Sequence, residues 1–207
     1  RKDLATIILG ATGYRNYREG VATNSDPPLA VFEQFVQCRI LSGVRRRPLG
    51  IESLNKMCEE ILARAGLINT ESEWYQGRPI MITANDYAIG LANGDVGLCL
   101  YRNGQLSVAF AKGDGTVKWV HPMRLEAVET AYAMTVHKAQ GSEFAHTVYV
   151  SPSRNNPVLT RELLYTAVTR ASEHFTLLDL NQSVLEQTIT SNIARASGLY
   201  DRIQALS

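Results

Sequence analysis

The sequence has few cysteines, no zinc pattern and no long apolar run. Its three cysteines are Cys38, Cys58 and Cys99, and no Cys-x-x-Cys pair occurs. This odd, widely spaced set argues against a disulfide scaffold and fits a reducing compartment, so we expect a cytoplasmic protein. The four histidines show no metal-ligand spacing, and we expect no metal site. No stretch approaches the ~20 apolar residues of a membrane span, so no membrane partner is expected.

A strong charge of one sign is also missing. The net charge is +1, which argues neither for nor against a nucleic-acid partner. Basic residues gather in VRRRP, from Val44 to Pro48. Such a run is either a solvated turn or a grip on phosphates, and the sequence leaves both open. The length of 207 residues and the 45% hydrophobic fraction predict a globular protein with a sizeable core.

Four common catalytic signatures are absent. No G-x-x-x-x-G-K-[ST] phosphate loop occurs, because GATGYRNYREG lacks the Lys-Ser/Thr ending. QGSEF lacks the G-x-S-x-G elbow of serine hydrolases. We also find no acidic strand end suited to Mg²⁺ and no carboxylate cluster for two metals. The chain by itself is therefore not expected to hydrolyse ATP.

Helical and strand patterns alternate along most of the chain. Apolar residues from Leu4 to Ala11 recur at helical spacing, and because the chain does not begin with Met we expect a fragment that starts inside a helix. That helix should end near GYRNYREG. The next should begin with Asp26 as N-cap and Pro27 at its first position. A further helix is predicted from Ile51 until Gly66 stops it.

Strands are predicted at CRILS (38–42), RPIMIT (78–83), ETAYAMTV (129–136), HTVYVS (146–151) and FTLLDL (175–180). RELLYTAVTRA (161–171) and SVLEQTITSNI (183–193) read as helices. This alternation predicts a parallel α/β sheet covered on both faces. Between Asp95 and Pro122 the texture changes to short strands separated by RNGQ and KGDG. We interpret that segment as a small antiparallel unit inserted in the α/β domain.

Three segments together carry a family resemblance. MTVHKAQGSEF (134–144) resembles motif V of superfamily 1 helicases, and LLYTAVTRA (163–171) resembles their motif VI. GRPIMITANDYAIGLANGDVG (77–97) is similar to the segment that precedes motif V in the RecD-type branch. Order and spacing agree as well. From about Asp26 to the C-terminus, the chain resembles the RecD family, the alpha subunits of bacterial exodeoxyribonuclease V.

The resemblance implies a fold and a division into domains. The implied fold would be the second RecA-like motor domain of a helicase, with an inserted SH3-like β unit. A helical lead-in would span 1–26 and the first part of the motor domain 27–87. The insert would span 88–125, and the second part of the motor domain, with motifs V and VI, would span 126–207.

The resemblance also implies an activity. It indicates an ATP-dependent 5′-to-3′ DNA helicase that uses Mg²⁺, binds single-stranded DNA and assembles with RecB-like and RecC-like subunits in double-strand break repair. The phosphate loop and the metal ligands would lie in an N-terminal part outside this chain, and nuclease chemistry would belong to another subunit. Two alternatives stay open: a nucleic-acid-binding module without catalysis, and a standalone RecD-like helicase.

The resemblance assigns residues to the nucleotide. Arg170 would reach the γ-phosphate across an interdomain cleft, where a guanidinium stabilises the charge of the transition state. Its position at the rim of the apolar stripe of its helix allows this, although an ordinary surface ion pair is the alternative. Glu143 would bind the ribose, and Gly141 would let backbone N–H groups approach phosphate. Arg39, at the place of motif IV, is a further candidate for nucleotide contact.

Other residues are assigned to single-stranded DNA. Thr135, His137 and Lys138 would meet backbone phosphates, although His137 alone could equally be a structural donor. Asn85 and Tyr87 follow a predicted buried strand and would border the DNA path. For that segment, a hairpin turn at Asn93-Gly94 is an equal alternative. Tyr101 and Trp119 in the insert are either stacking platforms or core residues.

Overall fold

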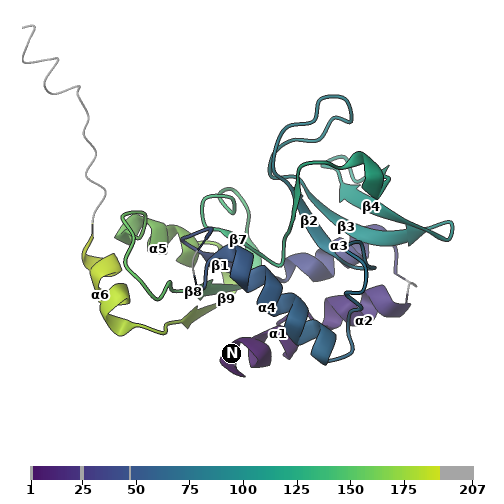
Figure 1. Ribbon diagram of the computed structural model, residues 1–207. Coiled ribbons are helices and arrows are strands. Elements are labelled where there is room, and N and C mark those ends of the chain that lie inside the picture. The colour runs from purple at the N-terminus through teal and green to yellow at the C-terminus, as the bar shows by residue number, and fades with distance from the viewer. Residues whose placement is uncertain (1, 24–25, 47, 192–207) are drawn as a thin grey trace, which may run out of the picture.

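The computed structural model describes residues 2–23, 26–46 and 48–191, and two separate sheets organise them (Figure 1). The first sheet is parallel throughout and has the strand order β7-β1-β8-β9. Its strands are β1 (Cys38–Ser42), β7 (Ala133–Thr135), β8 (Phe144–Val150) and β9 (Ala171–Leu178). Every residue of β1 is buried, as expected for a central strand covered on both faces.

The second sheet is antiparallel and has the order β5-β4-β3-β2-β6. Its strands are β2 (Pro79–Ile82), β3 (Val96–Arg102), β4 (Gln105–Ala111), β5 (Val117–Val120) and β6 (Val128–Thr130). A short 3-10 helix, η1 (Pro122–Arg124), follows β5. The predicted fold class, an α/β protein with a parallel sheet and a separate antiparallel unit, is confirmed.

Helices cover the two faces of the parallel sheet differently. They are α1 (Lys2–Leu9), α2 (Arg15–Thr23), α3 (Pro28–Val36), α4 (Ile51–Arg64), α5 (Arg161–Val168) and α6 (Gln182–Thr190). Ile40 and Val148 point from the sheet into a core shared with α1 to α4. Leu41 and Tyr149 point to the opposite face and pack with residues of α5 and α6. The core around α1 to α4 also includes Leu98 and other residues of β3 and β4, so the same helices join both sheets.

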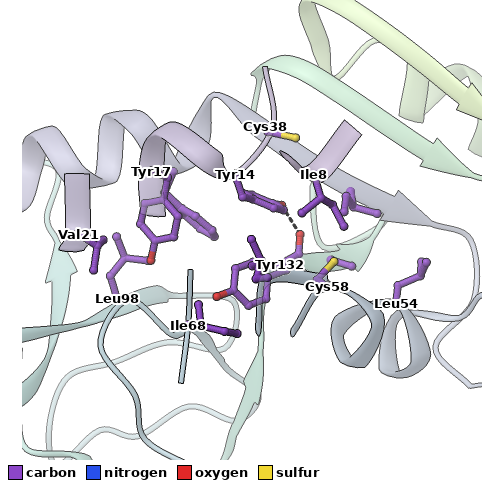
Figure 2. Close-up of a cluster of buried hydrophobic side chains, with 14 of the residues drawn as sticks. Ile8, Tyr14, Tyr17, Val21, Cys38, Leu54, Cys58, Ile68, Leu98 and Tyr132 are labelled. Carbon is purple, nitrogen blue, oxygen red and sulfur yellow. Dashed lines mark hydrogen bonds between the residues drawn. The ribbon is translucent and has the colours of Figure 1, made fainter. Parts of the chain in front are cut away.

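A tyrosine cluster holds the point where the chain passes from one sheet to the other (Figure 2). Tyr132 lies between β6 and β7 and is fully buried. Its carbonyl accepts a hydrogen bond from the hydroxyl of Tyr14, and the rings of the two tyrosines pack edge to face. The hydroxyl of Tyr17, on α2, donates to the carbonyl of Gly77 at 2.7 Å, just before β2. Burial raises the pKa values of Tyr14 and Tyr17 well above 10, so these hydroxyls remain donors.

Two strand predictions were wrong in their pairing. The strand at RPIMIT was expected in the parallel α/β part, but β2 pairs antiparallel with β3 and β6. ETAYAMTV was expected as one strand, but it divides into β6 and β7, one in each sheet. An apolar run indicates burial and not the partner strand, and β2 is buried on both faces. The antiparallel sheet therefore begins before residue 88 and ends after residue 125.

Several helix boundaries also differ from the prediction. Helix α1 ends at Leu9, near GYRNYREG as predicted, but that segment itself forms most of α2. Asp26 is not the N-cap of α3. Pro27 takes that position, and the Asp26 carboxylate accepts from Gln34 Nε2 at 3.1 Å. The motif VI helix ends at Val168, because Ala171 already begins β9. Helix α4 ends as predicted, with Gly66 at φ +71°. Residues 192–207 of the predicted last domain segment lie outside the described residues.

Candidate nucleotide and nucleic-acid interface

The loop 136–143 runs from the carboxyl ends of the strands in the parallel sheet to their amino ends. Thr135, at the end of β7, lies beside Ser42 at the carboxyl end of β1. His146 lies beside Cys38 at the amino end of β1, and β8 begins two residues earlier at Phe144. At ~3.3 Å per residue, the end of β7 and the start of β8 are therefore about 20 Å apart along the strand direction. The first residues of this loop thus lie where the strands end, which we call the carboxyl edge of the sheet. Its last residues lie where the strands begin, which we call the amino edge.

Backbone hydrogen bonds shape this loop into consecutive turns. The N–H groups of Lys138 and Ala139 donate to the Thr135 carbonyl at 3.0 and 3.2 Å, and Ser142 N–H donates to the Ala139 carbonyl at 3.1 Å. Ala139 is fully buried and anchors the middle of the loop. Gly141 adopts φ +84°, and no heavy atom lies within 4 Å of where a Cβ would stand. Because that conformation suits glycine, an open stretch of backbone is available at the amino edge.

The Arg170 side chain contacts the same end of the loop. Its Nη1 donates to the Ser142 carbonyl at 2.9 Å, and its Nε donates to the Thr166 carbonyl at 3.3 Å. Its own carbonyl accepts from Phe144 N–H at 2.9 Å, which fixes Arg170 at the amino end of β8. The guanidinium bonds go to carbonyls and a hydroxyl, so in the described part of the chain no carboxylate is paired with it. The structure thus brings Arg170 next to Gly141 and Glu143, both exposed.

Arg39 does not share this arrangement. Its side chain is only 2% exposed and lies between the rings of Phe35 and Phe144, at 4.3 and 5.1 Å from their centroids. Nη1 donates to the Ala131 carbonyl at 2.8 Å, and burial lowers the pKa of the guanidinium. The expected contact of Arg39 with a nucleotide is therefore corrected. Two aromatic side chains enclose its charge inside the protein, where it holds the segment between β6 and β7.

The residues assigned to single-stranded DNA lie at the carboxyl edge of the parallel sheet. Lys138 Nζ donates to Asn93 Oδ1, and Asn93 N–H donates to Asn85 Oδ1 at 2.8 Å. Asn85 Nδ2 in turn donates to the Tyr87 hydroxyl at 3.2 Å. Tyr87 is 88% exposed although its ring is apolar. A continuous row of polar contacts thus joins Lys138, Asn85 and Tyr87.

Thr135 and His137 flank this row from the parallel sheet. Thr135 is half-buried, and its Oγ1 accepts from Lys138 N–H at 3.3 Å. His137 is exposed, and its carbonyl accepts from Gln140 N–H at 3.3 Å. Thr135 thus shapes the turn that presents Lys138, and His137 presents its ring to solvent beside it.

Sequence reasoning missed two residues that connect the candidates. Asn93 links Lys138 to Asn85, and the carbonyl of Ser142 receives Arg170. The Asn-Gly pair at 93–94 was read only as a turn, and Gly94 does adopt φ +100°. A backbone carbonyl such as that of Ser142 leaves no side-chain signal, so the sequence could not have identified it.

The arginine-rich turn is engaged in ion pairs. Arg45 lies 2.5 Å from Glu129 and 3.9 Å from Glu52, and Arg46 lies 3.5 Å from Glu52. Arg47 lies outside the described residues. These pairs favour the solvated-turn interpretation over a phosphate grip.

Trp119 in the antiparallel sheet also has a structural contact. It packs partly buried against the core, with the Arg102 guanidinium 5.3 Å from its ring centroid. Its core interpretation is therefore favoured over a stacking platform.

The described residues offer neither a metal cluster nor a membrane-spanning helix. In the ranges 2–23, 26–46 and 48–191, no three His, Cys, Asp or Glu side chains come close enough together to hold an ion. No helix in the same ranges has the length and apolar character needed to cross a bilayer.

Comparisons with known proteins identify relatives among helicases. Residues 130–178 match the family of UvrD-like helicase C-terminal domains. The chain is 42% identical over 180 residues to the RecBCD enzyme subunit RecD of Haemophilus influenzae, covering 86% of this chain and 27% of that protein. It is 37% identical over 181 residues to the RecD subunit of Mycobacterium tuberculosis H37Rv, covering 87% and 31%. It is 32% identical over 170 residues to the ATP-dependent RecD2 DNA helicase of Deinococcus radiodurans, covering 81% and 23%.

The chain therefore spans between 23% and 31% of the length of these relatives. Among solved structures, it resembles the Bacteroides Pif1 helicase bound to single-stranded DNA, with a TM-score of 0.47 and 14% identity over 93% of this chain and 53% of that one.

Proposed function

The chain belongs to the RecD-like helicases, and on that premise we propose that it is the second motor domain of an ATP-dependent 5′-to-3′ DNA helicase. In this proposal it supplies an arginine finger to the nucleotide and part of the path for single-stranded DNA. A companion domain supplies the phosphate loop and the ligands of Mg²⁺. The chain alone then neither hydrolyses ATP nor unwinds DNA.

The observation that carries this proposal is the position of the Arg170 guanidinium. It donates to the carbonyl of Ser142, the residue that lies between Gly141 and Glu143 in the sequence. A cation held by neutral carbonyls keeps its charge for an external anion, whereas a cation paired with a carboxylate has already been neutralised. Phosphoryl transfer spreads negative charge over the transferring oxygens, and an arginine brought in across an interface accelerates it by roughly 10³- to 10⁵-fold.

The neighbouring loop residues suit the rest of a nucleotide. The open backbone at Gly141 lets N–H groups come close to phosphate oxygens without an intervening side chain. Glu143 is exposed one residue beyond Ser142, and its carboxylate could accept hydrogen bonds from a ribose. In the proposal, Arg170, Gly141 and Glu143 form one wall of a nucleotide pocket, and the companion domain forms the other wall.

The same loop gives a physical route for coupling. Its first residues, His137 and Lys138, are at the edge assigned to DNA, and its last residues contact Arg170. Hydrolysis or release of the nucleotide at the amino edge would shift the loop, and the same loop contacts the DNA strand at the carboxyl edge. We assign Thr135, His137 and Lys138, together with Asn85 and Tyr87, to that strand.

The proposed biological setting follows from the relatives. Those with the RecD name are subunits of the RecBCD enzyme, so we propose RecB-like and RecC-like partners, a role in double-strand break repair and a cytoplasmic location. The similarity to a RecD2 helicase favours a second candidate, the same motor without such partners. Native mass measurement of the protein purified from its host separates the two: a heterotrimer supports the first and a lone helicase the second.

Replacement of Arg170 tests the motor proposal. In the protein together with its phosphate-loop domain, we expect Arg170→Ala to lower kcat for ATP hydrolysis by roughly 10³-fold or more, with affinity for single-stranded DNA unchanged within about twofold. Arg170→Lys keeps a charge but loses the planar fork, so it should restore little activity. Arg64→Ala, at an exposed arginine of α4, is the matched control. A nucleic-acid-binding module without catalysis would have no ATPase activity to lose.

A further inference from the structure

A side-chain hydrogen bond connects the loop 84–95 of the antiparallel unit to the loop 136–143 of the parallel sheet. Lys138 Nζ donates to Asn93 Oδ1, and the two residues lie 45 positions apart in the sequence. From Asn93 the contacts continue through Asn85 to the hydroxyl of Tyr87. The Lys138 ammonium and the Tyr87 ring are therefore held in one network, although they come from different sheets.

Asn93 stands on a rigid support. Asp86 and Leu91 exchange two backbone hydrogen bonds of 2.8 and 2.9 Å across the loop. The Asp86 carboxylate accepts from the N–H groups of Ala88 and Ile89 at 3.1 and 3.2 Å. Gly94 N–H donates to the carbonyl of Ile82, the last residue of β2, at 2.8 Å. The backbone on both sides of Asn93 is thus tied to β2 and to its own loop, which places the Asn93 side chain within reach of Lys138.

The bond to Asn93 restricts the Lys138 side chain, which is long and otherwise free to adopt many rotamers. A lysine side chain loses rotamer entropy when it is fixed in one position. The bond to Asn93 meets that cost before a ligand arrives. An ammonium has three donors, so two remain for a ligand. Tyr87 contributes a flat apolar face that is almost fully open to solvent.

We propose that Asn93 is a positioning residue that holds Lys138 and Tyr87 together as one surface for single-stranded nucleic acid. The ammonium meets a backbone phosphate, and the tyrosine ring stacks on an unpaired base. The pairing of a cation with an exposed ring selects a single strand, because the base faces of a duplex are covered by their neighbours. This inference rests on the proposed function, and it adds that the DNA surface is complete only when the two loops are joined.

A double-mutant cycle on the intact protein tests the role of Asn93. The readout is fluorescence anisotropy of a labelled oligothymidylate, measured over a series of salt concentrations. We expect Lys138→Met to weaken binding about tenfold, the effect of one lost charge-assisted contact. It should also lower the slope of log K against log[salt] by about 0.7. Asn93→Ala should weaken binding by a similar factor, and the double variant should bind no more weakly than Lys138→Met alone.

Matched controls and a second variant keep the test decisive. Lys56→Met and Asn69→Ala change exposed residues that take no part in the network and should bind like the wild type. Asn93→Ser, too short to reach Lys138, should repeat the loss seen with Asn93→Ala and serves if the alanine variant does not fold. Wild-type-like binding by both Asn93 variants, with Lys138→Met weakened, would overturn the positioning role alone. Additive losses in the double variant would also overturn it. A wild-type protein that does not bind the oligonucleotide would overturn the DNA side of the proposed function as well.

Discussion

The hydroxyl of Tyr17 provides a measurable test of how the helices are joined to the antiparallel sheet. The side chain is fully buried, and its hydroxyl donates to the Gly77 carbonyl at 2.7 Å. Tyr17→Phe keeps the ring and removes this donor. Among the described residues, the Gly77 carbonyl would then keep only the Tyr132 hydroxyl as a donor, at 3.5 Å. A buried carbonyl left so poorly satisfied costs about 1 to 3 kcal/mol, which lowers Tm by roughly 2 to 12 °C in a protein of this size.

Urea unfolding followed by circular dichroism measures this loss. We expect the midpoint to fall while the m-value stays constant, because the surface exposed on unfolding is unchanged. Tyr87→Phe is the matched control: Tyr87 is 88% exposed, so its change should stay within about 0.5 kcal/mol. A Tyr17→Phe variant as stable as the control would refute the argument that this hydrogen bond secures α2.

Two further predictions concern buried groups. Burial raises the pKa values of Cys38 and Cys99 from 9.0 to about 12, so above pH 9 the unfolded state releases these protons first. The free energy of unfolding should therefore fall between pH 9 and about 12, by up to about 1.4 kcal/mol per pH unit for each thiol. Urea titrations should show a shallower decline for Cys38→Ala, and an equally steep decline would contradict this. Arg39→Met should leave nucleotide affinity within about twofold, because the guanidinium is enclosed. A tenfold loss in equilibrium binding of a fluorescent nucleotide would restore Arg39 as a nucleotide contact.

The sequence predicted elements well where a single local signal decides the outcome. Helix α4 shows its apolar period from Ile51 and ends before Gly66, whose positive φ favours glycine. The fully apolar run around β1 predicted a buried strand. The family motifs predicted that Arg170 and the Gly141 loop belong to one region, and the structure brings them into contact through Ser142.

The remaining features depend on contacts between distant segments. β2 is as apolar as a strand of a parallel sheet, and only its neighbours β3 and β6 show that it is antiparallel. Arg39 sits on a strand, and its enclosure requires Phe35 and Phe144 from two other elements. Asn93 reads locally as a turn residue, and its role depends on a lysine in the other sheet. No periodicity or propensity encodes such pairings.

The central claim is that Arg170 completes a nucleotide pocket in the transition state, and binding of a transition-state analogue tests it most directly. The measurement compares the affinity for ADP with aluminium fluoride to the affinity for ADP alone, in the protein with its phosphate-loop domain. An arginine that stabilises only the transition state should make the wild type bind the analogue at least ~100-fold more tightly than ADP. Arg170→Ala should lose most of that difference and keep its affinity for ADP. An unchanged preference for the analogue in Arg170→Ala would contradict the account.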